Sequence, residues 1–329
     1  MISDNYPAGL YPLNDTLLGK FREEVLSGLH RKAKRLPSKY FYDKTGDMLF
    51  QRIMACPEYY LTNCELEIFQ SKTADLAQII TSDNGTFDLI ELGAGDATKS
   101  QYLLKYLSDQ KASFTYMPID ISGNILSVLE KRLKDEITGL DVTCLEGEYF
   151  EMLRIAAELS GRRKIVMFLG ANIGNMEPRE AKEFCRDLRA HLAPGDLVLM
   201  GVDLKKHPKL IWEAYNDSAG LTSRFNLNLL HRINRELKGD FDPDQFEHYQ
   251  TYDPGSGACK SHLVSLQDQI VTIGDSKIVF GRDESVFMEI SQKYTLEEVD
   301  NLARETGFVP VYSCPDTKGW FVDAFWKAV

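Results

Sequence analysis

The sequence lacks the features that would place the chain in a membrane, outside the cell or on nucleic acid. Among its 329 residues, no apolar run is long enough for a membrane-spanning helix, and the N-terminus lacks the apolar core of a signal peptide. Positive charge is scarce, with 38 Lys and Arg against 49 Asp and Glu. The resulting net charge of −11 disfavours a nucleic acid or an anionic membrane as a partner. These absences predict a cytoplasmic globular protein, and the lack of an apolar heptad stripe predicts a monomer.

Cysteine is sparse and unpatterned. The chain has no C-x-x-C pair and no His/Cys spacing typical of a metal site. We therefore expect no metal, and we expect reduced thiols that mainly occupy the core. The six cysteines are Cys56, Cys64, Cys144, Cys185, Cys259 and Cys314.

The most informative stretch is a strand, a glycine turn and a helix. Residues 87–92 are apolar and β-prone, Gly93 and Gly95 then interrupt the strand, and residues 99–107 resume at helical spacing. This corner typically binds a nucleoside or phosphate at the edge of a doubly wound sheet. The third glycine of a dinucleotide fingerprint is absent, because Thr98 stands there. Glu91 just before the turn would repel a pyrophosphate and attract a sulfonium or an ammonium group.

Two later segments complete a pattern typical of S-adenosylmethionine (SAM) binding. A second apolar strand, residues 114–120, ends in Asp120, which is placed to hydrogen-bond a ribose diol. Glu148 and Tyr149 follow Gly147 and would supply an acid and an aromatic ring near an adenine. The ordered elements predict a class I methyltransferase with SAM as the methyl donor.

The alternation of strands and helices, and the point where it stops, predict two domains. Strands and helices alternate over residues 87–204, stop over 205–282, and return in a C-terminal helix with two closing strands. We predict an α/β, Rossmann-like, seven-stranded class I methyltransferase domain from residues 62–204 plus 292–329. A second, α+β substrate-binding domain is predicted from residues 1–61 plus 205–291.

Several ordered segments stand out along nearly the whole chain. They are Tyr40-Phe-Tyr-Asp43 with Gly46 and Leu49-Phe50, Pro57-Glu-Tyr-Tyr60, Glu91-Leu-Gly-Ala-Gly95 with Lys99, Gly170-x-x-Ile-Gly-Asn175, Ala214-Tyr-Asn-Asp217, Phe225-Asn-x-Asn228 and Met288-Glu-Ile-Ser291. Together they resemble one family, the histidine-specific Nα-methyltransferases of ergothioneine biosynthesis.

The resemblance implies a role for each matching residue. Tyr59, Asn175 and Tyr215 match residues that hold the substrate α-carboxylate and amine, and Gly170 also belongs to the substrate site. Tyr42 matches a tyrosine that faces the imidazole, and Glu289 with Ser291 matches the pair that selects it. Tyr42, Tyr59 and Asn175 are the implied catalytic residues. The implied SAM site consists of Glu91, Gly93, Gly95, Lys99, Asp120, Glu148 and Tyr149.

The chain departs from the family pattern at two positions. Asn172 stands where the family has a small residue or threonine, and Ser261 stands in the substrate pocket where the family often has methionine. The implied reaction is transfer of methyl groups to the α-nitrogen of L-histidine, giving trimethylhistidine. Three alternatives stay open: methylation of another aromatic amino acid such as tryptophan, an NAD-dependent oxidoreductase, and a non-catalytic SAM- or amino-acid-binding protein.

Overall fold

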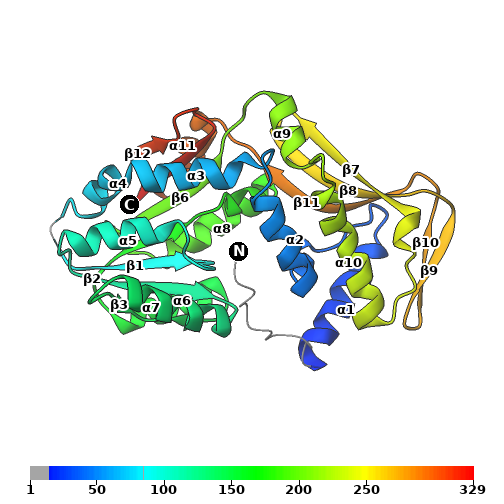
Figure 1. Ribbon diagram of the computed structural model, residues 1–329, viewed down its shortest axis with the longest axis horizontal. Helices are drawn as coiled ribbons and strands as arrows, with labels where there is room; N and C mark the ends of the chain where they lie inside the picture. The colour runs from blue at the N-terminus through cyan, green and yellow to red at the C-terminus, as the bar shows by residue number, and fades with distance from the viewer. Residues whose placement is uncertain (1–14, 84) are drawn as a thin grey trace. The chain divides into compact units, whose positions relative to one another are not determined.

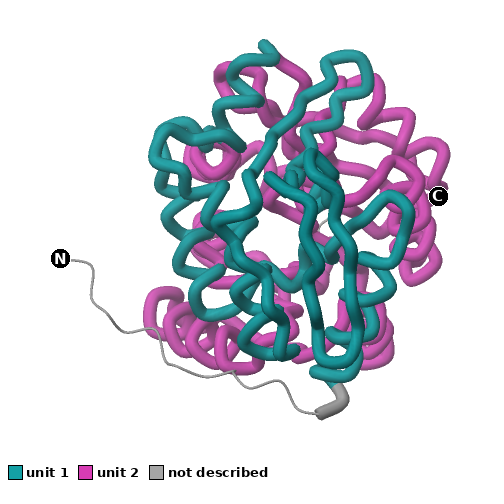
Figure 2. Tube along the Cα trace, turned by 90° about the vertical axis from the view of Figure 1, so that its right-hand side faces the viewer, with its two compact units in different colours: residues 1–60, 207–291 teal, residues 61–206, 292–329 magenta. Residues whose placement is uncertain are grey.

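The computed structural model describes residues 15–83 and 85–329. The chain divides into two compact units, coloured separately in Figure 2. Unit 1 comprises Met1–Tyr60 and His207–Ser291, and unit 2 comprises Leu61–Lys206 and Gln292–Val329. The functional assignment of these units stays a prediction.

Unit 2 is built on a mixed sheet whose strand order is β12-β13-β6-β5-β1-β2-β3. The central strands β6, β5, β1 and β2 are parallel, and β13 is antiparallel to both of its neighbours. The strands are β1 (Phe87–Leu92), β2 (Phe114–Asp120), β3 (Asp141–Val142), β4 (Leu145–Glu146), β5 (Arg163–Phe168), β6 (Leu197–Asp203), β12 (Phe308–Pro315) and β13 (Phe321–Ala328). Strand β1 lies at the point where the order reverses, and ligands bind at such points in open α/β sheets.

Helices cover this sheet because its central strands bury both of their faces. Every residue of β1 and of β6 is buried, which is typical of parallel strands with helices on both sides. Residues of α7, α8 and α11 share one hydrophobic cluster with β1, β2, β5 and β6, and α4 packs beside α5. Figure 1 shows the helices α3 (Tyr60–Ser71), α4 (Thr73–Ile80), α5 (Ser100–Asp109), α6 (Gly123–Glu136), α7 (Tyr149–Leu159), α8 (Pro178–Ala190) and α11 (Leu296–Glu305).

The fold is therefore the predicted α/β, Rossmann-like, class I methyltransferase fold, closed by an antiparallel hairpin. One detail differs from prediction. The sheet has eight strands instead of seven, because β3 and β4 pair separately with β2.

Unit 1 contains a three-stranded sheet in the order β11-β8-β7 and a separate two-stranded hairpin, β9-β10. Helix α10 contributes Leu229, Leu230 and Ile233 to a core shared with α1 and the sheet. The elements are α1 (Asp15–Leu29), α2 (Lys44–Met54), α9 (Pro208–Ala214), α10 (Leu221–Leu237), β7 (Phe246–Asp253), β8 (Ala258–Ser265), β9 (Gln269–Ile273), β10 (Ser276–Phe280) and β11 (Ser285–Gln292). Short 3₁₀ helices span Ser38–Phe41, Asn172–Asn175 and Pro243–Gln245.

The cysteines are all free thiols, and all except Cys144 are buried. Among the helices in the described part of the chain, none combines the length and the apolar character needed to cross a bilayer.

Candidate functional site

The glycine corner of unit 2 lies where β1 ends. Gly93 and Gly95 have φ of +70° and +52°, in the left-handed region that favours glycine. The Gly93 amide donates to the carbonyl of Ile119 at 2.8 Å, which ties the turn to β2. A side chain at Gly93 would also lie 2.7 Å from the Tyr149 hydroxyl. Gly93 therefore allows the tyrosine ring to approach the turn.

Asp120 joins three of the predicted SAM-binding segments. Its Oδ2 accepts the Gly95 amide at 3.2 Å, and its Oδ1 accepts the Ser122 amide at 3.0 Å. Its carbonyl accepts the Gly147 amide at 3.0 Å, just before Glu148 and α7. Glu148 is exposed. The structure thus brings Gly93, Gly95, Asp120 and Tyr149 together.

Glu91 is buried on β1, and its Oε2 accepts the Tyr116 hydroxyl at 2.5 Å. Burial raises the pKa of this carboxyl to about 7, although the bond from Tyr116 acts in the opposite direction. At neutral pH the group is consequently divided between its neutral and ionised forms. Sequence reasoning treated it as a fixed negative charge.

Lys99 and Gly170 are linked through Glu65, a residue that sequence reasoning missed. Lys99 forms an ion pair with the Glu65 carboxylate, which also accepts the Gly170 amide at 2.7 Å. Burial opposes the charge on Lys99, but the neighbouring Glu65 carboxylate outweighs it and raises the lysine pKa. A sequence signal was available, because Glu65 precedes the buried Ile68 and Phe69 by three and four residues. This spacing places the acid on the apolar face of a helix.

The turn after β5 is strained and polar. Gly170 has φ +76°, and Ala171 follows at φ +56°, which is uncommon for a residue with a side chain. Asn175 is exposed at the end of the 3₁₀ helix Asn172–Asn175, and its amide donates to Asn172 Oδ1 at 3.5 Å. Gly170 and Asn175 belong to unit 2, whereas the other predicted substrate residues belong to unit 1.

The predicted substrate tyrosines of unit 1 form a continuous aromatic cluster. The ring of Tyr42 lies 5.6 Å from Phe50, Phe50 lies 6.4 Å from Tyr59, and Tyr59 lies 5.9 Å from Tyr215, each in an edge-to-face arrangement. The face of an aromatic ring attracts a cation, so the cluster can contribute to binding a positively charged group.

Strand β11 presents the predicted imidazole-selecting pair next to this cluster. The hydroxyls of Tyr215 and Ser291 form a hydrogen bond of 2.7 Å. Glu289 precedes Ser291 by two residues, so both side chains lie on the same face of the strand. Ser261 Oγ on β8 lies 3.4 Å from Glu289 Oε1, which places the substituted position beside the acid.

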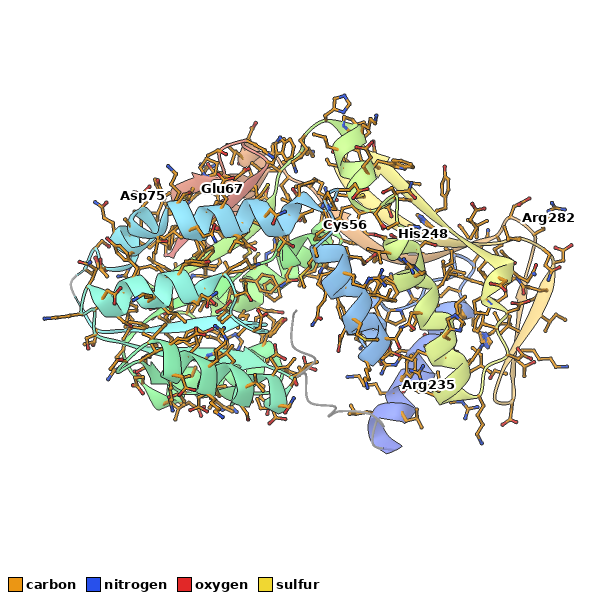
Figure 3. The ribbon with its side chains drawn as sticks, in the orientation of Figure 1. Cys56, Glu67, Asp75, Arg235, His248 and Arg282 are labelled. Carbon is orange, nitrogen blue, oxygen red and sulfur yellow. The ribbon has the colours of Figure 1, made fainter. Side chains whose placement is uncertain are left out.

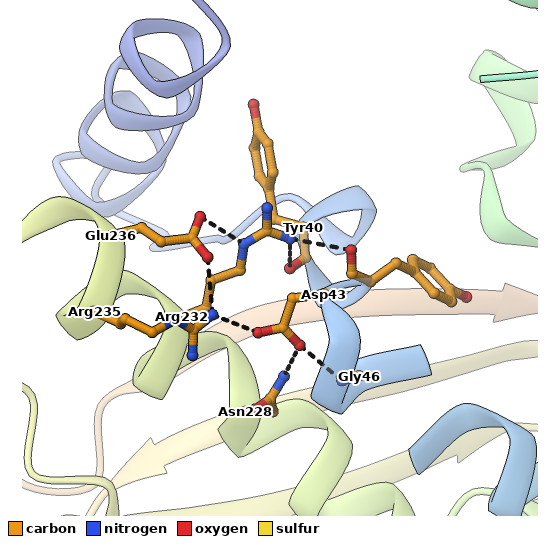
Figure 4. Close-up of polar contacts among 8 residues, drawn as sticks. Tyr40, Asp43, Gly46, Asn228, Arg232, Arg235 and Glu236 are labelled. Carbon is orange, nitrogen blue, oxygen red and sulfur yellow. Dashed lines mark hydrogen bonds and ion pairs between the residues drawn. The ribbon is translucent and has the colours of Figure 1, made fainter. Parts of the chain in front are cut away.

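The Tyr42 backbone is held by a polar clamp from α10, shown in Figure 4. Arg232, 3% exposed, donates to the carbonyls of Tyr40 and Tyr42 at 3.1 and 3.2 Å. Asp43 accepts from Gly46, Asn228 and Arg235 at 2.7, 2.8 and 2.6 Å. Burial opposes the Asp43 charge, but these donors outweigh it and lower the pKa of Asp43. Two of the segments that carried the family resemblance, residues 40–43 and 225–228, are therefore parts of one clamp.

Two further polar residues of β7 were missed by sequence reasoning. Gln250 is 5% exposed and bonds to Ser261, and His248 contacts the same hydroxyl. Figure 3 labels His248, together with Arg235 of α10. No sequence signal set these residues apart, because polar residues in an antiparallel strand usually face solvent.

The reversed strand order, the antiparallel closing hairpin and the glycine corner with Asp120 define a class I SAM-dependent methyltransferase. Comparison of the sequence with family models is consistent with this class. The model of the histidine-specific, SAM-dependent methyltransferases matches residues 21–328, and the chain belongs to that family.

Characterised relatives span nearly the same length. The chain is 34% identical to a histidine N-alpha-methyltransferase of Mycobacterium tuberculosis, over 84% of this chain and 85% of that protein. It is 32% identical to the protein of the same name in Mycolicibacterium smegmatis, over 94% and 96%. It is also 29% identical to an L-tryptophan methyltransferase of Psilocybe serbica, over 91% and 90%. The protein is thus a SAM-dependent methyltransferase, and the oxidoreductase and non-catalytic alternatives lose their support.

Proposed function

We propose that the protein methylates the α-amino nitrogen of free L-histidine to give Nα,Nα,Nα-trimethylhistidine, the first step of ergothioneine-type biosynthesis. The observation that carries this proposal is the side-chain set of unit 1. Glu289 lies beside Ser261, and Ser291 bonds to Tyr215, which packs against Tyr59. A carboxylate and a hydroxyl two residues apart suit the two nitrogens of an imidazole.

The amino-acid end of the substrate needs neutral donors for its carboxylate. We assign this role to Tyr59 and Tyr215 of unit 1. Phenol groups donate a hydrogen bond without adding charge. Tyr42 faces the imidazole through a water molecule in this proposal.

The residues of unit 2 fit SAM, which supplies an electrophilic methyl group on a sulfonium. Gly93 and Gly95 leave the backbone open to a close ligand, and no atom within 4 Å would meet a side chain at Gly95. Asp120 suits the ribose hydroxyls, and Glu148 with Tyr149 suits the adenine. Lys99 suits the carboxylate of the methionine part, and Glu91 in its ionised form suits the positive charge.

Catalysis in this proposal comes mainly from orientation. The α-nitrogen attacks the methyl carbon in line with sulfur, so that an N–C bond forms, the S–C bond breaks and S-adenosylhomocysteine leaves. One proton leaves the nitrogen for each methyl group added and passes to solvent. Tyr42 and Tyr59 stabilise the growing cationic nitrogen through their ring faces.

The experiment that tests this role exchanges Glu289 for alanine. We expect Glu289→Ala to lower kcat/KM for histidine by about a hundredfold, since the imidazole N–H loses a charged acceptor. The Kd for SAM, measured by calorimetry, should stay within about twofold of the wild-type value, because the assigned SAM residues belong to unit 2. An equal loss of SAM binding and of turnover would contradict the assignment.

A second candidate substrate is tryptophan or a derivative. Ser261 favours it, because a serine leaves more room beside Glu289 than the methionine common in the family. Turnover of tryptophan that exceeds turnover of histidine would move the assignment to this candidate.

A further inference from the structure

The buried face of the three-stranded sheet in unit 1 carries a polar pair, and one of its members, Gln250, has no role in the proposed site. Gln250 on β7 stands directly opposite Ser261 on β8, and the two are 5% and 1% exposed. The neighbouring Leu263 is buried and apolar, as expected for such a face. Burying a polar pair costs free energy unless its hydrogen bonds are made, so the pair indicates a function beyond packing.

The hydrogen bonds of Gln250 fix the orientation of its amide. The nitrogen Nε2 donates to the thiol sulfur of Cys259 at 3.0 Å and to the carbonyl of Thr251 at 3.3 Å. The oxygen Oε1 consequently faces Ser261 and accepts its hydroxyl at 2.6 Å. The backbone of Gln250 is also held, because its carbonyl accepts the indole N–H of Trp212 on α9 at 3.3 Å.

The Ser261 hydroxyl therefore has its single proton committed to Gln250. It lies 3.4 Å from Glu289 Oε1, which is much longer than its 2.6 Å bond to Gln250. His248 Nε2 lies 3.3 Å from Ser261 Oγ and can donate to it. Burial lowers the pKa of His248 to about 4, so this ring is neutral near pH 7 and adds no positive charge beside Glu289.

We propose that Gln250 is a positioning residue for substrate selection: it holds the Ser261 proton away from Glu289, so that the Glu289 carboxylate accepts an N–H of the substrate side chain. This inference rests on the proposed role of Glu289. Without the Gln250 acceptor, the Ser261 hydroxyl turns to Glu289 and competes with the substrate for the carboxylate oxygen.

The test is a double-mutant cycle on Gln250 and Ser261 in the full-length protein. Gln250→Leu should raise the KM for histidine by about tenfold and leave kcat and the Kd for SAM nearly unchanged. Ser261→Ala removes the competing hydroxyl and sets the reference KM of the cycle. In the double variant the hydroxyl is also gone, so the KM should lie within about threefold of the Ser261→Ala value.

A purely structural role for Gln250 predicts the opposite cycle, in which the double variant is at least as impaired as Gln250→Leu. That result, or an unchanged KM in Gln250→Leu, would overturn the inference. Thermal melting and SAM binding check that each variant is folded, and Gln250→Met replaces Gln250→Leu if the latter does not fold. Absence of histidine turnover by the wild-type protein is a different result: it would overturn the proposed function, and this inference with it.

Discussion

At the scale of single residues, the structure shows how burial decides the behaviour of charged groups in unit 2. Glu91 and Asp203 are both buried on strands of the same sheet, yet their pKa values move in opposite directions. At Glu91, the effect of burial is the largest and raises the pKa. At Asp203, burial is outweighed by the ammonium groups of Lys293 and Lys206, which lower its pKa.

The raised pKa of Glu91 predicts a pH dependence of SAM binding. A bound cation favours the ionised carboxylate, so binding should release a proton from Glu91 and the affinity should increase as pH rises through about 7. We expect the Kd for SAM to fall roughly five- to tenfold between pH 6 and pH 8. Calorimetry in buffers of different ionisation enthalpy measures both the Kd and the proton release.

The matched control for this prediction is Glu91→Gln, which keeps the size of the side chain and removes its titration. The variant should lose most of the pH dependence. A wild-type Kd with the same pH profile as Glu91→Gln would contradict a contact between the Glu91 charge and SAM.

The buried ion pairs of Asp203 predict a large effect on stability. Its Oδ2 lies 2.6 Å from Lys293 Nζ, and its Oδ1 pairs with Lys206. Asp203→Asn leaves two buried ammonium groups without their counter-charge, so we expect a loss of about 3–5 kcal/mol in the free energy of unfolding. Chemical denaturation at pH 7 measures the loss. The control is Glu183→Gln, which removes the charge from an exposed ion pair with Arg179 and should change the free energy of unfolding by less than about 1 kcal/mol.

The sign of the pH dependence follows from the lowered pKa of Asp203. Its stabilising contribution is present above the unfolded value of about 4 and is lost as pH falls through the lower folded value. The stability difference between wild type and Asp203→Asn should therefore shrink below about pH 4. A difference that persists there would show that it does not arise from the charge.

At the scale of elements, helix α10 orders the segment that carries Tyr42. Arg232 reaches two carbonyls of this segment, and Asn228 reaches Asp43 at the start of α2. The clamp fixes the backbone on both sides of Tyr42, while the Tyr42 side chain is 43% exposed. The position of the tyrosine thus depends on a helix that follows it by almost two hundred residues in sequence.

Removing the clamp should weaken substrate binding more than SAM binding. In Arg232→Met, the carbonyls of Tyr40 and Tyr42 and the Glu236 carboxylate lose a donor, so we expect a loss of about 2–4 kcal/mol in stability. The KM for histidine should rise by about tenfold, with an unchanged Kd for SAM. Steady-state kinetics and calorimetry measure the two quantities.

The control for the clamp is Arg224→Met on the exposed face of the same helix. Arg224 donates to the carbonyls of Ala219 and Gly220 just before the helix, so its loss should leave the KM for histidine unchanged. Equal effects of the two variants would mean that α10 acts through its general stability instead of through the clamp.

The strands differ in how well the sequence predicts them. The buried strands β1 and β2 were predicted because parallel strands form short, continuous apolar runs. Strands β7 and β8 were missed, because Gln250 and Ser261 place polar side chains on the buried face and break the expected alternation. The glycine corner was predictable from local spacing. The partners of Glu65 and Arg232 were not, because they lie far away in sequence.

At the scale of the whole molecule, the chain interrupts a methyltransferase fold with a second unit. Residues 207–291 leave the first fold after β6 and return before α11, and they join the N-terminal segment in unit 1. In the proposed function, the residues assigned to the methyl donor belong to unit 2 and those assigned to the side chain of the acceptor belong to unit 1.

The central claim is that L-histidine is the methyl acceptor. The most direct measurement incubates the purified protein with SAM and each of the twenty amino acids, and reads mono-, di- and trimethylated products by mass spectrometry. We predict trimethylhistidine as the dominant product, with at most traces from tryptophan. Methylation of tryptophan or another amino acid in preference to histidine would contradict the account.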